Sequence, residues 1–106
     1  MTTNQMMLAI LAIDPNASLK FSDMTNQWYL DLSCEISDGF FLTGPTEHRD
    51  TPEAAIVALF KRITEIPPKQ CISVYCGSDK PRQHYRWQGF MWKPTHLSTE
   101  HHEGHR

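Results

Sequence analysis

The chain has 106 residues, of which 40% are apolar and 21% charged, and its net charge at neutral pH is -2. This length suits one domain with a substantial core, and the charge indicates neither a nucleic-acid nor a membrane partner. The longest apolar run, residues 6–13, is shorter than the roughly 20 residues that span a bilayer. No basic residue precedes this run, as it would in a signal peptide, so we expect a cytoplasmic protein.

The first half of the chain predicts one helix followed by strands. Residues 3–13 carry apolar side chains at helical spacing, and a proline soon after them ends the helix. Alternation at residues 19–21 indicates a short edge strand, and residues 28–33 indicate a longer strand with its tryptophan and leucines on one face. The Asp-Gly pair at residues 38–39 favours a tight turn into a returning strand at residues 40–43.

Residues 51–66 predict an amphipathic helix with a well-marked start. Thr51 suits the N-cap, Pro52 suits the first helical position, and Glu53 complements the positive end of the helix dipole. One apolar stripe runs along the segment, and Pro67 prevents continuation. The stripe consists of Ala55, Leu59, Ile63 and Ile66, widened by Ile56 and Phe60.

The second half predicts a strand at residues 71–76, with Ile72 and Val74 facing the core, and a strand at residues 84–92, with Gly89 indicating a bulge or bend inside it. The element order is α-β-β-α-β-β. We therefore expect an α+β fold, in which a small antiparallel sheet of about four strands packs on the helix at residues 51–66. We expect a single domain over residues 1–95 and a flexible His-rich tail over residues 96–106.

The three cysteines, Cys34, Cys71 and Cys76, do not form a CxxC motif, and their odd number does not fit a secreted disulfide framework. We expect each of them to act as a small buried hydrophobe.

A segment rich in cations and aromatics, residues 80–93, is the main candidate for binding. Exposed tryptophan and arginine side chains are typical of protein-binding hot spots, and the same side chains can stack on unpaired bases and hold phosphates. The alternative is a core strand with hydrated charges. The binding residues that we predict are Arg82, His84, Arg86, Trp87, Phe90, Trp92 and Lys93.

Two further clusters of polar residues are weaker candidates for a functional site. Four histidines lie at residues 96–105, but the glycine and polar residues among them disfavour a helix that would align them, so we expect no metal site and no cofactor. The loop at residues 46–50 contains His48 between acidic and basic residues, as in an acid/base site. No nucleophile accompanies it, and we expect Asp50 to serve the helix start. We therefore expect no enzymatic activity.

The strand at residue 28, the Gly-containing turn and the D-T-P-E-A-A run at residues 50–55 together resemble HicB-type antitoxin domains. They also resemble small uncharacterised proteins encoded by tailed phages and prophages. The likeness covers residues 28–66, and the rest of the chain offers no ribbon-helix-helix or helix-turn-helix segment like those of HicB proteins. The phage resemblance implies an accessory role in the host cytoplasm.

From these features we favour a non-enzymatic, phage-type accessory protein that binds and modulates or inhibits a host protein complex, as anti-defence proteins do. One alternative is a protein that binds single-stranded nucleic acid or a nucleotide through residues 80–93. The other alternative is a HicB-like antitoxin. Homo-oligomerisation through a sheet edge is compatible with each hypothesis.

Overall fold

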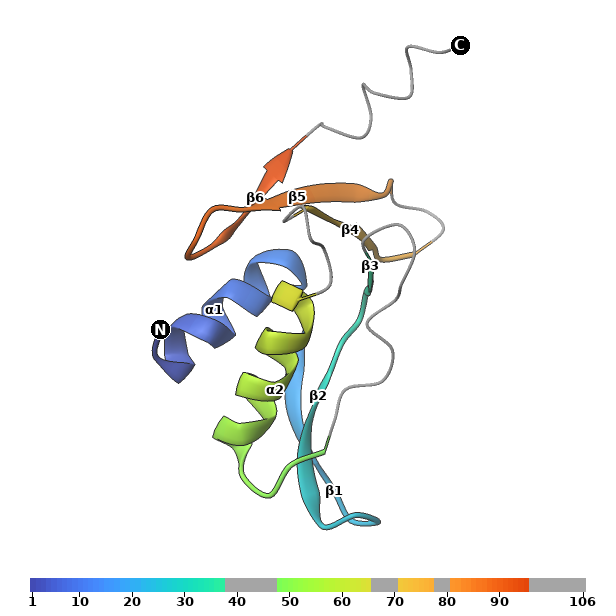
Figure 1. Ribbon diagram of the computed structural model, residues 1–106. Helices are drawn as coiled ribbons and strands as arrows, with labels where there is room; N and C mark the ends of the chain where they lie inside the picture. Colours follow the sequence, from blue (N-terminus) through green and yellow to red (C-terminus); the bar gives the residue numbers. More distant parts are fainter. Residues whose placement is uncertain (38–47, 66–70, 78–80, 96–106) are drawn as a thin grey trace.

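The computed structural model describes residues 1–37, 48–65, 71–77 and 81–95 (Figure 1). Within these ranges the fold is α+β, as predicted, with the order α-β-β-β-α-β-β-β. The helices are α1 (Thr3–Ile13) and α2 (Pro52–Glu65). The strands are β1 (Ser18–Ser22), β2 (Gln27–Asp31), β3 (Glu35–Ser37), β4 (Cys71–Tyr75), β5 (Gln83–Trp87) and β6 (Trp92–Thr95).

Both helices begin with side-chain caps. In α1, Thr2 Oγ1 accepts a hydrogen bond from Gln5 N at 3.1 Å, and Gln5 Oε1 accepts one from Thr2 N at 2.7 Å. In α2, Thr51 Oγ1 accepts from Ala54 N at 3.1 Å, which confirms the predicted N-cap. The carboxylate of Asp50, which we expected to serve this helix start, accepts a 2.8 Å hydrogen bond from Gln27 Nε2.

The strands form two antiparallel sheets, one of β1 and β2 and one in the order β3-β4-β5-β6. The edge strand predicted at residues 19–21 is β1, and the strand predicted at residues 28–33 corresponds to β2. The sequence did not predict β3, which pairs with β4. The turn at residues 38–39 and the strand at residues 40–43 lie outside the described residues.

The single strand predicted at residues 84–92 is wrong. It is a hairpin in which β5 and β6 are joined by a tight turn that Gln88 N closes by donating to Met91 O at 2.9 Å. Gly89 lies in this turn with φ at 92°, a left-handed conformation that glycine adopts without steric cost. The glycine therefore marks a reversal of the chain. The edge strand β6 then places Pro94 opposite Tyr85.

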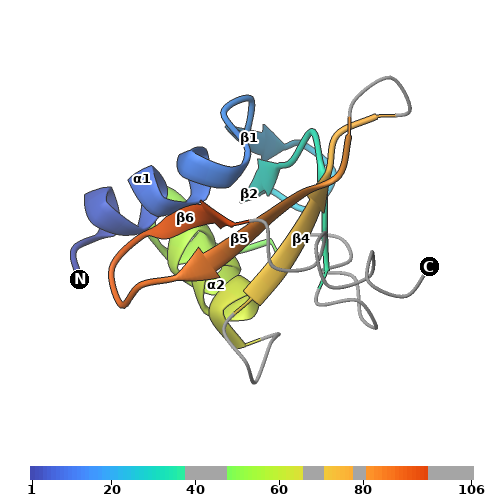
Figure 2. The same cartoon turned by 90° about the horizontal axis from the view of Figure 1, so that it is seen from above.

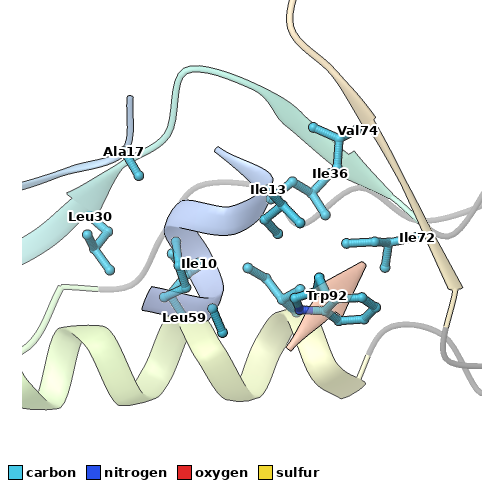
Figure 3. Packing of buried hydrophobic residues seen from close by; sticks show 11 residues of the cluster. Ile10, Ile13, Ala17, Leu30, Ile36, Leu59, Ile72, Val74 and Trp92 are labelled. Carbon is cyan, nitrogen blue, oxygen red and sulfur yellow. The ribbon is translucent and has the colours of Figure 1, made fainter. Parts of the chain in front are cut away.

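The core lies between the two helices and one face of the four-stranded sheet (Figure 2). Helix α1 packs against α2 and β6, while α2 packs against β2. Trp92, only 3% exposed, lies among the aliphatic side chains of both helices and the sheet (Figure 3). The predicted helix stripe is confirmed for Ala55, Leu59 and Ile63, which are buried.

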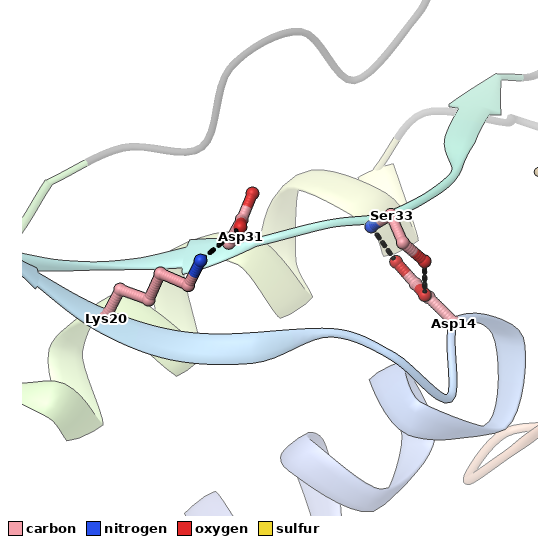
Figure 4. Close-up of polar contacts among 4 residues, drawn as sticks. All are labelled: Asp14, Lys20, Asp31 and Ser33. Carbon is pink, nitrogen blue, oxygen red and sulfur yellow. Dashed lines mark hydrogen bonds and ion pairs between the residues drawn. The ribbon is translucent and has the colours of Figure 1, made fainter.

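A buried carboxylate fastens the end of α1 to the segment between β2 and β3. Asp14 is 0% exposed and accepts hydrogen bonds from Ser33 N at 2.7 Å and Ser33 Oγ at 2.5 Å (Figure 4). It also accepts one from Asn16 N at 3.2 Å. These donors satisfy a group that would otherwise be costly to bury. The ion pair of Lys20 and Asp31, at 2.8 Å, is by contrast about half exposed.

The expectation that all three cysteines are simple buried hydrophobes is wrong for two of them. Cys34 and Cys76 form a disulfide, with their Cα atoms 4.2 Å apart, while Cys71 is free. The β3–β4 register explains the pairing: Glu35 is paired with Tyr75, so the next position brings Cys34 opposite Cys76. A count of cysteines could not show this, because the pairing depends on a strand that the sequence did not predict.

Candidate functional site: the outer face of the sheet

The four-stranded sheet has one face toward the core and one face away from it. Ile36, Ile72, Val74, Tyr85 and Trp92 point to the core side, as their burial and the strand register show. Because side chains alternate along each strand, their neighbours in sequence point to the opposite side, here called the outer face. Figure 2 looks onto this side, and both α1 and α2 lie behind the sheet in that view.

Cross-strand pairing arranges the outer face in three rows. The first row joins Glu35 to Tyr75, and Arg82 lies over the ring of Tyr75; the second row runs from Ser73 through His84 to Thr95, and the third from Cys71 through Arg86 to Lys93. Within the described strands, Glu35 is the single carboxylate on this face, and it lies on the edge strand. The remaining charges are cationic.

The third row places two positive charges directly opposite each other. Arg86 and Lys93 are paired across β5 and β6, and both side chains are exposed. The ion pair between Lys20 and Asp31 lies on the other sheet, and no described carboxylate neutralises the Arg86–Lys93 pair. Like charges directly opposite each other on a sheet are destabilising. The pair is therefore a local conflict that a bound anion would relieve.

The first row holds a third cation in a fixed position. The guanidinium of Arg82 lies over the ring of Tyr75, 5.0 Å from the centroid, and Arg82 Nη1 donates a 3.0 Å hydrogen bond to Ser73 Oγ. A cation–π contact and a hydrogen bond together restrain a long side chain that would otherwise sample many rotamers. Arg82 is nonetheless exposed, so its charge is available at the surface.

His84 lies in the middle row, between these cations. Burial, and then the positive charge of Arg82, lower the pKa of His84 below its usual value. The imidazole is therefore neutral near pH 7, where it can donate and accept hydrogen bonds and offers a ring for stacking. An anion bound nearby would act in the opposite direction and raise this pKa.

Four of the seven predicted binding residues, Arg82, His84, Arg86 and Lys93, therefore share the outer face. The two tryptophans do not join them. Trp92 belongs to the core, and Trp87 is half-buried on the core side, where its ring centroid lies 5.0 Å from that of Trp92. Their placement at a binding surface is thus wrong. The cause is the turn at Gly89, which returns the chain and leaves both indoles on the apolar side.

Phe90, the remaining predicted residue, is 60% exposed in the turn between β5 and β6 and is not part of the three rows. Sequence reasoning missed Tyr75 and Ser73, which support Arg82 from β4. The signal was present: Ile72 and Val74 were predicted to face the core, so the alternate residues of that strand had to face away.

The residues just before α2 hold this segment against β2. His48 stacks on Tyr29 with ring centroids 4.8 Å apart, and the main chain of Arg49 exchanges two hydrogen bonds with Trp28, at 2.7 and 2.8 Å. Thr46, Glu47 and the histidines of the tail lie outside the described residues. In the ranges that are described, no three His, Cys, Asp or Glu side chains gather in a way that could hold a metal ion.

The described helices also include none with the length and apolar character that a membrane span needs. Comparisons with protein-family models, with curated proteins and with solved structures found no match to this chain. The phage and HicB resemblances therefore stay predictions.

Proposed function

We propose that this protein is a non-enzymatic binding protein and that its outer face binds single-stranded nucleic acid. The opposed Arg86 and Lys93 carry the proposal. A phosphate placed between the two side chains would turn a repulsion into two charge-assisted contacts. A polyanion provides such phosphates at regular spacing, so it could also reach Arg82 in the first row.

The rings on the same face support this ligand class. Bases of single strands stack on aromatic side chains and on arginine guanidinium planes. The outer face offers the guanidinium of Arg82, held over Tyr75, and the ring of His84. Ser73 and Thr95 are small, so bases could approach the sheet closely between these groups. From the sequence we favoured a protein partner over nucleic acid. Because both tryptophans lie on the core side, the outer face lacks the apolar centre expected of a protein interface. We therefore now favour nucleic acid.

The test is a binding titration with a fluorescently labelled 12-nucleotide single strand at 50 and 200 mM salt. If Arg82, Arg86 and Lys93 each contact one phosphate, the single-strand relation gives a slope near −2, so affinity should fall about 20-fold. The variant Arg86→Ala/Lys93→Ala should bind more weakly at both concentrations, and the same relation gives it only about a threefold fall.

The matched control is Lys20→Ala/Lys61→Ala, which removes the same charge from β1 and α2 instead of the outer face. It should bind like the unaltered protein. Equal weakening in the two double variants would show that net charge alone attracts the strand. Absence of binding at 50 mM salt would refute the proposal.

A second candidate is the phage-type accessory protein that docks on a host protein complex in the cytoplasm. The exposed Phe90 at the turn, together with Leu8 on α1, 58% exposed, favours it, because neither side chain contributes to the buried core. Capture of one host protein that is lost with Phe90→Ser but retained by Arg86→Ala/Lys93→Ala would support this candidate. Capture that depends on the two cations instead would support the outer face.

A further inference from the structure

We propose that the Cys34–Cys76 disulfide is a thiol–disulfide exchange site that a small thiol attacks at Cys76. A surface hollow of about 300 Å³ is lined by both cysteines together with Ser33, Glu35 and Tyr75. The disulfide therefore lies at an opening large enough for a thiol to approach. The hollow shares Glu35 and Tyr75 with the first row of the outer face, but none of the three cations lines it.

The two sulfurs are not equivalent. Cys76 is exposed at the end of β4, whereas Cys34 is half-buried and packs against the core cluster. Exchange proceeds by attack of a thiolate on one sulfur, while the other sulfur leaves, and access decides which sulfur is attacked. The exposure of Cys76 makes its Sγ the electrophile and makes Cys34 the leaving group.

The exchange requires no reagent other than the incoming thiol. The incoming thiolate forms a bond to Cys76 Sγ, the Cys34–Cys76 bond breaks, and Cys34 Sγ leaves with the bonding pair and takes one proton from solvent. Ser33 Oγ lies 3.6 Å from Cys34 Sγ, and its own proton is donated to Asp14. The Ser33 oxygen can therefore accept a hydrogen bond from the Cys34 thiol that forms.

The core would retain Cys34 after the exchange. Its neighbour Ile36 is 0% exposed, and β3 keeps its paired positions with β4 from Glu35 to Ser37. The product is therefore a folded protein with a mixed disulfide on Cys76 and a thiol on Cys34. A second thiol would release the adduct and leave two thiols. In a reducing compartment the surrounding thiol pool would keep this pair reduced.

The experiment uses the folded full chain and millimolar reduced glutathione. The reaction is stopped with acid at short times, free thiols are alkylated, and peptides are mapped by mass spectrometry. We expect glutathione on Cys76 and the alkyl group on Cys34 at least tenfold more often than the reverse. The variant Cys71→Ser, which removes the free thiol, should give the same pattern and so exclude reshuffling through Cys71.

Three outcomes would overturn the proposal. Glutathione could be found on Cys34 as often as on Cys76, or exchange could occur only after denaturant is added. Alternatively, all three cysteines of the purified protein could alkylate without any reductant, which would show that the bond does not form. Circular dichroism before and after exchange shows whether the reacting protein is folded.

Discussion

Reversal of one charge on the outer face should stabilise this protein while it weakens nucleic-acid binding. In Arg86→Glu, the new carboxylate lies opposite the exposed Lys93, so a like-charge pair becomes an attractive one. Directly opposed charges contribute about 0.2–1 kcal/mol, so the exchange of repulsion for attraction should add about 1 kcal/mol after allowance for solvent screening. In a domain of this size that corresponds to a melting temperature about 4–8 °C higher.

The assay is thermal unfolding at 20 and 500 mM salt, followed by circular dichroism. The gain should appear at low salt and shrink at high salt, because ions screen exposed charges. The variant Arg86→Glu/Lys93→Glu restores a like-charge pair and should lose the gain, whereas Lys61→Glu on α2 controls for net charge. The reasoning is refuted if Arg86→Glu melts lower at low salt, or if its effect does not depend on Lys93.

Three other predictions concern the core, the buried carboxylate and the histidine. Trp92→Ala should destabilise the fold by about 3–5 kcal/mol in urea unfolding, whereas Phe90→Ala should change its stability by less than about 0.5 kcal/mol; similar effects would contradict the exposed fractions of 3% for Trp92 and 60% for Phe90. Asp14→Ala should cost about 1–3 kcal/mol, because it leaves the part-buried donors of Ser33 without their acceptor, and an unchanged urea midpoint would refute the role of the contacts in Figure 4. Because the pKa of His84 is lowered in the folded state, its contribution to stability is complete above the unfolded pKa near 6.5 and is lost as pH falls through the folded pKa. In an NMR titration, Arg82→Ala should move this pKa only part of the way back, since burial is the larger cause, and a full return would show that the charge of Arg82 dominates.

The elements that were predicted correctly are those whose sequence signals, such as caps and apolar periodicity, lie within a few neighbouring residues. The start of α2 was readable from Thr51 and Pro52, and the inward side of β4 from Ile72 and Val74. The α+β class followed from the order of such segments. These predictions succeeded because capping and periodicity are properties of neighbouring residues.

The features that the sequence did not predict depend on contacts between distant residues. The cross-strand disulfide needs β3 beside β4, and its cysteines are 42 positions apart. The binding set was wrong about the tryptophans, because Gly89 fits a bulge inside one strand as well as a turn between two. Only the β5–β6 register decides between these, and it also reveals the opposed charges of Arg86 and Lys93.

The proline in the edge strand affects how copies of this chain can meet. Pro94 has no N–H, so a strand arriving from another molecule would find a missing donor in the middle of β6. Lys93, next to Pro94, would also lie close to any charged side chains of the added strand. Fibre growth by addition of strands to the β6 edge of the sheet is therefore disfavoured. Concentrated solutions should not aggregate unless strands pair with the β3 edge or with the β1–β2 sheet.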